Sequence, residues 1–280
     1  MEKDQLDILV TLDEGYMMQL RVMLTSLYLN HPDKACRVYL LHSRISEKLL
    51  AELEEGLNAL GYSLFPIQVN SSLFEQAPVT KQYPQEMYYR LLASRLLPEE
   101  LDRILYLDPD ILVINSLKSL WTLDLGNCLF AAAAHTGKTE FANSVNRIRL
   151  GTDGNYYNSG VLLMNLERCR EEIVPETIFD FVKTHAVELV LPDQDVLNAM
   201  FSSKILEIDD FLWNYDARNY MNYFMRSSGE ANMDWVMKNT SVLHFCGKEK
   251  PWKEHYRHRF GVLYRHYMQL ADRYLPVNII

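Results

Sequence analysis

The sequence has few cysteines, and their spacing suggests neither a bridge nor a metal site. The four cysteines are Cys36, Cys128, Cys169 and Cys246, and no two of them form a C-x-x-C pair. This spacing argues against a disulfide framework or a zinc site. Reduced thiols in a cytoplasmic protein are therefore expected.

Long apolar runs are also missing from the chain. Nowhere do about 18 apolar residues follow one another, which is the length that a membrane-spanning helix needs. The first four residues are mostly charged and lack the apolar stretch of a signal peptide. We expect a soluble protein without an integral membrane segment, and the sequence leaves peripheral membrane association open.

Positive charge is scarce, since 28 Lys and Arg residues face 37 Asp and Glu residues and give a formal net charge of -9. Binding to nucleic acid needs clustered cations, so no nucleic-acid partner is expected. A small anionic ligand needs only a few cations and is not excluded. The chain also contains neither G-x-G-x-x-G nor G-x-x-x-x-G-K-[ST]. Any bound nucleotide must therefore have its phosphates held by other residues.

The 280 residues, 48% of them hydrophobic, are enough for a large core. Short apolar runs rich in branched residues predict buried strands, and amphipathic segments between them predict helices. This alternation predicts an α/β fold with a mostly parallel central sheet flanked by helices. The expected strands are 8–12, 37–41, 104–107, 129–133, 161–164 and 242–245, and the expected helices are 16–30, 46–60, 84–97 and one that starts near Pro175.

The segment Tyr106-Leu107-Asp108-Pro109-Asp110-Ile111-Leu112-Val113 carries two carboxylates inside an apolar run. Side chains two positions apart on an extended chain point to the same side, so Asp108 and Asp110 would repel each other without a cation between them. Pro109 cannot donate a ladder hydrogen bond, which places the pair at a strand end. Oxygen ligands favour Mg²⁺ or Mn²⁺. An ordinary solvated turn would explain the same residues.

A second polar segment, His244-Phe245-Cys246-Gly247-Lys248-Glu249-Lys250-Pro251-Trp252, follows the last predicted strand. The His244 imidazole could complete a carboxylate metal site and would favour Mn²⁺ over Mg²⁺. Gly247 would let backbone amides approach a phosphate, and Lys250 could neutralise its charge. A hydrogen-bonded core histidine followed by a solvated turn is the alternative interpretation.

Three further segments have both a functional and an ordinary explanation. Asp13 could accept a hydrogen bond from a nucleobase on which Tyr16 stacks, or Asp13 could cap the following helix. Asn158, in Tyr156-Tyr157-Asn158-Ser159-Gly160, could contact a sugar hydroxyl or belong to a simple turn. Capping explains one aspartate of Asp193-Gln194-Asp195 but explains Gln194 less well.

Taken together in this order, the four motifs resemble the retaining glycosyltransferases of family 8, which include bacterial lipopolysaccharide galactosyltransferases and glucosyltransferases and the glycogenins. The matching segments extend from Asp13 to Trp252. They are Leu105–Asp110, Asn158–Leu166, Asp193–Asn198 and His244–Lys248.

The resemblance implies a GT-A type fold, with a nucleotide-sugar-binding catalytic domain over residues 1–250 and a helical extension over 251–280 packed on it. It also implies a metal-dependent hexosyltransferase that moves galactose or glucose from a UDP-sugar donor to a saccharide or glycolipid acceptor. The implied metal is Mn²⁺, with Mg²⁺ possible, held by Asp108, Asp110 and His244. The implied catalytic residues are Gln194, close to the anomeric carbon, and Asp193. The implied donor-binding residues are Thr11, Asp13, Tyr16, Arg90, Asp108, Pro109, Asn158, Gly247 and Lys250.

The chain departs from the family pattern at two positions. Gly15 stands where relatives often carry an asparagine that helps hold the nucleotide. His135 stands where a galactosyl-transferring branch has an aspartate, so the sugar is not identified. The acceptor pocket is expected within residues 213–235, whose aromatic side chains could equally belong to the core.

Two other functions fit parts of the pattern. A haloacid-dehalogenase-type phosphatase also has D-x-D at a strand end, and Lys204 with Asp209 and Asp210 could complete its site. Such enzymes place that motif near the N-terminus, whereas Asp108 lies deep in the chain. A nucleotide-sugar-binding protein with weak or no catalysis is the second alternative.

Overall fold

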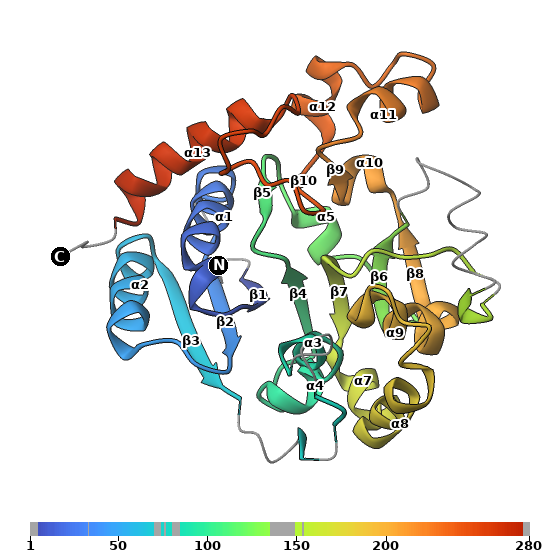
Figure 1. Cartoon of the computed structure of the whole chain (residues 1–280). Helices are drawn as coiled ribbons and strands as arrows, with labels where there is room; N and C mark the ends of the chain where they lie inside the picture. Colours follow the sequence, from blue (N-terminus) through green and yellow to red (C-terminus); the bar gives the residue numbers. More distant parts are fainter. Residues whose placement is uncertain are drawn as a thin grey trace.

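The structure is a computed structural model that describes residues 5–32, 34–69, 74–75, 77–79, 85–134, 149–152 and 154–276. Its centre is a seven-stranded sheet of order β3-β2-β1-β4-β7-β6-β8, and a smaller sheet of order β5-β10-β9 lies beside it (Figure 1). The strands of the large sheet are β1 (Leu6–Thr11), β2 (Cys36–His42), β3 (Tyr62–Gln68), β4 (Arg103–Leu107), β6 (Phe130–Ala133), β7 (Val161–Asn165) and β8 (Ile205–Ile208). Those of the small sheet are β5 (Ile111–Val113), β9 (Tyr215–Asp216) and β10 (Val242–His244).

Most neighbouring strands of the large sheet run parallel, as predicted. The pairs β1–β2, β2–β3, β1–β4 and β6–β8 are parallel. The exception is β7, which is antiparallel to both β4 and β6. The start of β7 therefore lies at the same edge of the sheet as the ends of β1 and β4.

The large sheet is buried on both faces, which explains why its strands read as continuous apolar runs. Alternate side chains enter different cores: Leu9 and Tyr106 belong to one, whereas Ile8, Val10 and Leu105 belong to the other. All five side chains are fully buried.

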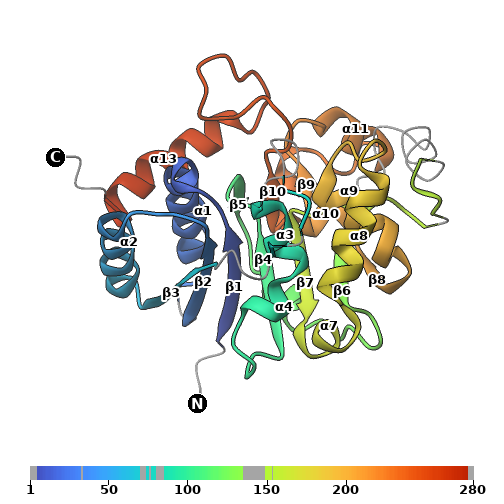
Figure 2. The ribbon, with the colours of Figure 1, turned by 60° about the horizontal axis from the view of Figure 1, so that its bottom comes forward.

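Helices cover both faces, and the two views agree on their arrangement (Figures 1 and 2). Side chains of α1 and α2 fill one core, and those of α3, α4, α7, α8 and α9 fill the other. Their bounds are α1 (Met17–Asn30), α2 (Glu47–Ala59), α3 (Glu86–Leu91), α4 (Ala93–Leu96), α7 (Leu166–Glu172), α8 (Pro175–His185) and α9 (Pro192–Phe201). The remaining helices are α5 (Lys118–Trp121), α10 (Asp210–Trp213), α11 (Tyr220–Arg226), α12 (Met233–Asn239) and α13 (Gly261–Tyr274).

The predicted helix over residues 84–97 is interrupted. It divides into α3 and α4 at Leu92, whose φ of -105° and ψ of 16° depart from helical values. Pro84, the predicted first residue, lies outside the described residues. The predictions for 16–30, 46–60 and a start near Pro175 are confirmed by α1, α2 and α8 to within a few residues.

The predicted strand over residues 242–245 is confirmed to within one residue, but it lies outside the large sheet. It is β10, which pairs with β5 and β9 in the small sheet. The sequence interpretation also missed β3, whose burial alternates: Tyr62 and Leu64 are buried, but Ser63 and Phe65 are exposed. A search for continuous apolar runs does not detect such an edge strand.

A third core lies between the small sheet and helices α10 to α13. Helix α13 packs against α1, and Arg21 on α1 donates to the backbone oxygen of Leu275 at 2.5 Å. All four cysteines carry free thiols. Among the described helices, none combines the length and the hydropathy that crossing a bilayer requires.

Strand β5 is fixed to α1 by side-chain hydrogen bonds. The Val113 amide donates to Ser26 Oγ at 2.9 Å, and the Val113 carbonyl accepts from Asn30 Nδ2 at 3.0 Å. Ser26 is fully buried. These contacts hold the strand that directly follows Asp110.

We predict that Ser26→Ala lowers the free energy of unfolding by about 1–3 kcal/mol, because the buried Val113 amide loses its acceptor. Denaturant unfolding followed by circular dichroism measures this change. Ser46→Ala is the matched control, since Ser46 is exposed and its side chain makes no capping hydrogen bond. Equal stabilities of the two variants would contradict the prediction.

Candidate functional site

The predicted site residues gather where three strands of the large sheet meet at one edge. Thr11 ends β1, and Asp108 follows the end of β4. Residues 158–160 come immediately before β7 and reach the same edge because β7 runs in the opposite direction. Leu107 is paired with Val161, and the Asp108 amide donates to the Gly160 carbonyl at 2.8 Å.

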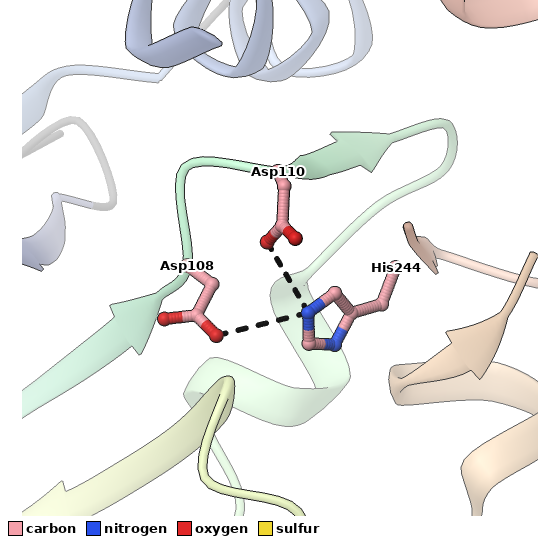
Figure 3. A group of neighbouring side chains, drawn as sticks. All are labelled: Asp108, Asp110 and His244. Atoms are coloured by element: carbon pink, nitrogen blue, oxygen red, sulfur yellow. Dashed lines mark ion pairs between the residues drawn. The ribbon is translucent and has the colours of Figure 1, made fainter. Parts of the chain in front are cut away.

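Asp108, Asp110 and His244 converge at this edge (Figure 3). One ligand atom from each lies within 4.8 Å of the others. His244 Nε2 is 3.2 Å from Asp110 Oδ1 and 3.7 Å from Asp108 Oδ2. All three side chains are largely buried, with exposures of 19%, 10% and 4% in the order above.

The small sheet brings His244 to the carboxylates. Strand β10 pairs antiparallel with β5, so that His244 lies opposite Ile111, the residue after Asp110. The Phe245 amide donates to the Asp110 carbonyl at 3.0 Å and extends this pairing. Backbone hydrogen bonds thereby bring together Asp110 and His244, which are more than 130 residues apart in the sequence.

Asn214 sets the orientation of the His244 ring, a role that the sequence interpretation missed. His244 Nδ1 lies 2.8 Å from Asn214 Oδ1, an oxygen that can only accept. The Nδ1 atom therefore carries the proton of this bond, and in the neutral ring Nε2 presents its lone pair to the two aspartates. Asn214 Nδ2 donates in turn to Asn158 Oδ1 at 2.9 Å.

Gly160 provides the space that this cluster occupies. A Cβ atom on Gly160 would lie 2.3 Å from His244 Cε1 and 2.6 Å from Asp108 Oδ2. Contacts this short do not occur between non-bonded carbon and oxygen atoms at equilibrium. Any larger residue would therefore push the ligand set apart.

Positive charge compensates the buried carboxylates. Burial by itself would raise the pKa of Asp110, but His244 and Lys250 hold that pKa well below its ordinary value. Lys250 Nζ contacts Asp110 Oδ2 and donates to the Phe245 carbonyl at 3.0 Å. Burial would lower the pKa of His244, yet Cys246 and Asp110 raise it well above the usual value.

Arg90 joins the metal-ligand cluster to the second group of predicted residues. Its guanidinium is 3.1 Å from Asp108 Oδ1 and 3.0 Å from Asp193 Oδ2, and it lies over the Tyr106 ring at 4.6 Å. Burial would lower the pKa of Arg90, but Asp108 raises it further above its ordinary value. Arg90 Nε is buried without a hydrogen-bond partner among the described residues.

Tyr106 connects Thr11 to the same carboxylate. Its hydroxyl donates to Asp108 Oδ1 at 2.5 Å and lies 3.2 Å from Thr11 Oγ1. This tyrosine was assigned only to the strand by sequence reasoning. Its position two residues before Asp108 on an extended chain is the signal that would have placed it on the same side.

The predicted catalytic residues are held by the segment before β7. Gln194 Oε1 accepts from Asn158 Nδ2 at 3.0 Å and from the Ser159 amide at 3.3 Å. The Ser159 hydroxyl donates to Asp193 Oδ2 at 3.0 Å. Gln194 and Asp193 thus lie beside Asn158 at the start of α9.

Asp195, between these residues and the core, has a structural role. It is fully buried and accepts hydrogen bonds from Arg149, from Tyr156 and from the amides of Val190 and Leu191. Burial would raise the pKa of Asp195, but the bonds from Arg149 and Tyr156 lower it. Its carboxylate is therefore occupied and turned away from the cleft.

A cleft of about 370 Å³ opens over this edge of the sheet. Tyr16 lies at its rim, 38% exposed, with its ring 6.3 Å from that of Trp252 in an edge-to-face arrangement. Asp13 accepts a hydrogen bond from the Gly15 amide, so the capping interpretation holds for one of its oxygens. The cleft is lined by Thr11, Leu12, Asp13, Tyr16, Glu86, Arg90, Asp108, Pro109 and Asp110.

Gly247 has a φ of +82°, a backbone conformation that favours glycine. A Cβ atom here would lie 2.1 Å from Arg218 Nη1. Both facts favour glycine at this position, and the predicted approach of its backbone to a phosphate stays a prediction. Arg218 was not among the predicted site residues.

The residues of the phosphatase alternative do not converge on Asp108. Lys204 pairs with Glu172 at 3.0 Å, and Asp210 pairs with Arg226 at 2.9 Å. Asp209 caps α10 through the Phe211 amide. His135, where the sequence departs from the family pattern, lies outside the described residues.

The Asp108, Asp110 and His244 set fits a small divalent cation. It offers two hard carboxylates and one imidazole nitrogen whose ring is oriented by a partner on its far side. The ligand atoms surround a common point from three directions, and the neighbouring Gly160 leaves that side open. The donor set is consistent with Mn²⁺ or Mg²⁺ and gives no preference from geometry alone.

Comparison with known proteins agrees with this architecture. The model of the family described as "Glycosyl transferase family 8" matches residues 7–255. General stress protein A of Bacillus subtilis is 29% identical over 277 residues, which cover 96% of this chain and 95% of that protein. The lipopolysaccharide 1,3-galactosyltransferase of Salmonella typhimurium is 23% identical over 255 residues, covering 90% and 74%.

Among solved structures, the galactosyltransferase LgtC in complex with donor and acceptor sugar analogs superposes with a TM-score of 0.79. The sequences are 26% identical, and the match covers 95% of this chain and 96% of LgtC. The predicted GT-A type fold is therefore confirmed, and the phosphatase alternative is excluded by the family match.

We predict that Gly160→Ala abolishes high-affinity Mn²⁺ binding or weakens it by at least about tenfold, because the added methyl displaces His244 and Asp108. Calorimetric titration with MnCl₂ measures the affinity. Gly154→Ala is the matched control, since its Cβ would approach Ser202 only to 3.7 Å. Unchanged metal binding by Gly160→Ala would contradict the prediction that Gly160 provides the space for the ligand set.

Asn214→Ala should weaken Mn²⁺ binding by about 10- to 100-fold, the usual effect of losing a partner that orients a histidine ligand. Asn214→Asp retains the acceptor oxygen and should recover part of the affinity. The same titration, with thermal melting to establish that both variants are folded, checks the prediction. If Asn214→Ala bound the metal like the unaltered protein, Asn214 would not be a positioning residue.

Proposed function

This chain belongs to glycosyl transferase family 8, and from that premise we propose that it is a retaining, Mn²⁺-dependent hexosyltransferase with a UDP-sugar donor. The observation that carries the proposal is the convergence of Asp108, Asp110 and His244 beside Arg90, whose side chain is 15% exposed. The diphosphate of a nucleotide sugar carries two negative charges, which a cation held by these residues would help to neutralise.

The donor would lie in the cleft over the ends of β1 and β4. Tyr16, at the rim, offers a ring face for the uracil, and Asp13 offers a carboxylate oxygen for its ring nitrogen. Arg90 has a buried Nε without a partner among the described residues, which a donor oxygen could occupy. Gly247 and Lys250 lie next to the metal-ligand set, where the diphosphate would be.

Galactose or glucose is the proposed sugar, and a saccharide or glycolipid hydroxyl is the proposed acceptor. The support comes from relatives named as lipopolysaccharide 1,2-glucosyltransferase and 1,3-galactosyltransferase. LgtC, by its description, is a galactosyltransferase crystallised with donor and acceptor sugar analogs. Assembly of lipopolysaccharide or another cell-surface polysaccharide is the process in which such a transfer would take place.

A divalent ion bound at this site would act as a Lewis acid on the leaving diphosphate. Lys250 would then add a positive charge on the same side and stabilise the oxygen from which the sugar departs. Asp193, held by Arg90 and Ser159, would lie near the positive charge that develops on the sugar ring.

Retention of configuration would follow from attack on the same face that the diphosphate leaves. A double displacement needs a nucleophile on the opposite face, and the Gln194 amide is a poor one. Its oxygen is held by Asn158 and Ser159, and the Asp195 carboxylate is fully occupied. The acceptor hydroxyl is the remaining nucleophile, and the leaving phosphate oxygen would take its proton. A covalent sugar adduct trapped on Asp193 or Asp195 would overturn this sequence of steps.

The first test is donor hydrolysis across a panel of nucleotide sugars, with and without Mn²⁺. We expect free UDP from UDP-galactose or UDP-glucose, only when the metal is present. Release of nucleotide without metal, or from a different nucleotide sugar alone, would require another function. UDP binding without any hydrolysis would favour the alternative of a non-catalytic nucleotide-sugar-binding protein.

Asp110→Asn should reduce metal-dependent UDP release by at least about 100-fold, since an amide oxygen is a far weaker ligand than a carboxylate. Thermal melting should remain cooperative, because the two side chains have nearly the same shape. Asp234→Asn, an exposed change on α12, is the control for loss of one negative charge. If Asp110→Asn released UDP as fast as the unaltered protein, the proposed role of the metal in the reaction would be wrong.

A further inference from the structure

A second cleft, with a volume of about 610 Å³, lies outside the donor cleft. It is formed by the end of β9, by α11 and by the segment before α13. We call it the basic cleft. Its lining residues are Ala217–Asn222, Met225 and Arg257–Arg259.

The basic cleft concentrates positive charge in a chain whose net charge is -9. Arg218, Arg257 and Arg259 line it together with His258. Among the described residues, no carboxylate lies within ion-pair distance of Arg257 or Arg259, and both are exposed. The nearby Glu249 is 3.2 Å from His258. Both guanidinium groups thus face solvent, and no carboxylate of the described residues pairs with them.

Arg218 connects the basic cleft to the donor site. Its Nε and Nη2 atoms are held by the buried Asp216 at 2.9 and 2.7 Å, which fixes the plane of the guanidinium. Its Nη1 atom is the atom closest to the Cβ position of Gly247. Gly247 is the residue proposed to contact the donor diphosphate. The basic cleft therefore borders the position proposed for the donor diphosphate.

The polar groups of the basic cleft suit a carbohydrate. Asn219 and Asn222 offer side-chain amides, which can both donate to and accept from sugar hydroxyls. The Tyr220 ring lies under Arg259 at 4.7 Å and stacks beside Phe224 at 6.1 Å. The sequence left open whether the aromatic side chains of residues 213–235 belong to the core. Tyr215 and Tyr223 do belong to it, because their rings are buried and stack with 3.9 Å between the ring centroids.

We propose that the basic cleft binds an acceptor saccharide that carries an anionic group, a phosphate or a carboxylate, which pairs with Arg257 and Arg259. This inference rests on the proposed function, because it names the chemical class of the acceptor for that transfer. Guanidinium groups bind both oxyanions through two parallel hydrogen bonds. With the anionic group at Arg257 and Arg259, the rest of the saccharide would extend along Arg218 toward Gly247.

A long polyanion or a membrane fits these observations less well. Three arginines in one cleft do not form the extended basic surface that nucleic acids require, and the net charge of the chain is -9. The arginines line a concave site beside the donor cleft, whereas a membrane is contacted by a protruding surface. A short anionic saccharide matches both the size and the position.

The test compares three probes that differ in one group: glucose, glucose 6-phosphate and glucuronic acid. Each is titrated calorimetrically in the presence of UDP and Mn²⁺, so that a phosphate cannot occupy the donor site. We expect glucose 6-phosphate or glucuronic acid to bind at least about tenfold more tightly than glucose. The probe that binds more tightly identifies the anionic group. Hydrolysis of UDP-sugars by the unaltered protein tests the proposed function separately.

Arg257→Ala combined with Arg259→Ala should remove the preference for the anionic probe. Arg44→Ala combined with Arg273→Ala is the matched control, because it removes two exposed arginines on other elements and should keep the preference. Circular dichroism establishes the folded state. If the double alanine variant does not fold, Arg257→Gln and Arg259→Gln are titrated singly, each with an expected partial loss.

Three outcomes would overturn the proposal. The first is equal affinity of the protein for the three probes, and the second is an unchanged preference in the variants of Arg257 and Arg259. The third is a protein that binds vesicles of phosphatidylglycerol but none of the three probes. The failure of the two proposals can be told apart. Loss of UDP binding with a retained, arginine-dependent preference would remove the donor assignment alone. UDP-sugar hydrolysis without any probe preference would remove only the anionic acceptor.

Discussion

Two carboxylates leave the sheet side by side at Asp108 and Asp110, and the surrounding structure is built on the need to compensate their charge. Like charges at this depth destabilise the fold unless cations or donors face them. Arg90 and the Tyr106 hydroxyl face Asp108, while Lys250 and His244 face Asp110. Arg90 comes from α3, Tyr106 from the end of β4, and His244 and Lys250 from the segment at the end of β10. The charge requirement therefore ties the large sheet, the small sheet and the C-terminal segment to one point.

Strand direction decides which segments can reach that point. In a purely parallel sheet, only residues after a strand lie at the carboxyl edge. The antiparallel β7 adds a segment that precedes its strand, and it brings Asn158 and Ser159 to Gln194 and Asp193. The small sheet contributes His244 by pairing β10 with β5. Gly160 lies where both arrangements meet, and its missing side chain lets them approach.

Some buried residues are not proposed to contact the donor, but they fix the orientation of side chains around the site. Asn214 holds both His244 and Asn158, so one buried amide links the candidate metal-ligand set to a residue proposed for the sugar pocket. Asp216 likewise holds Arg218 and fixes the plane of its guanidinium in the basic cleft. Buried, fully bonded amides and carboxylates of this kind fix geometry because any other arrangement would leave polar atoms unsatisfied.

The resemblance of its motifs to glycosyltransferase family 8 predicted the family. The sequence by itself also determined the fold class and singled out Asp108, Asp110 and His244 as a candidate metal-ligand set, because apolar runs and the polar residues that interrupt them are local signals. Buried strands such as β1 and β4 could be predicted for the same reason, whereas the edge strand β3 alternates and was missed. Only the tertiary structure decided that β10 belongs to a separate sheet, that Asp195 is structural, and that Asn214, Tyr106 and Arg218 join the site. Asparagine and arginine are common in loops and cores, and nothing in the local sequence of Asn214 or Arg218 marks a partner. Their roles come from contacts between residues far apart in the chain, which strand direction and side-chain packing create only when the chain is folded.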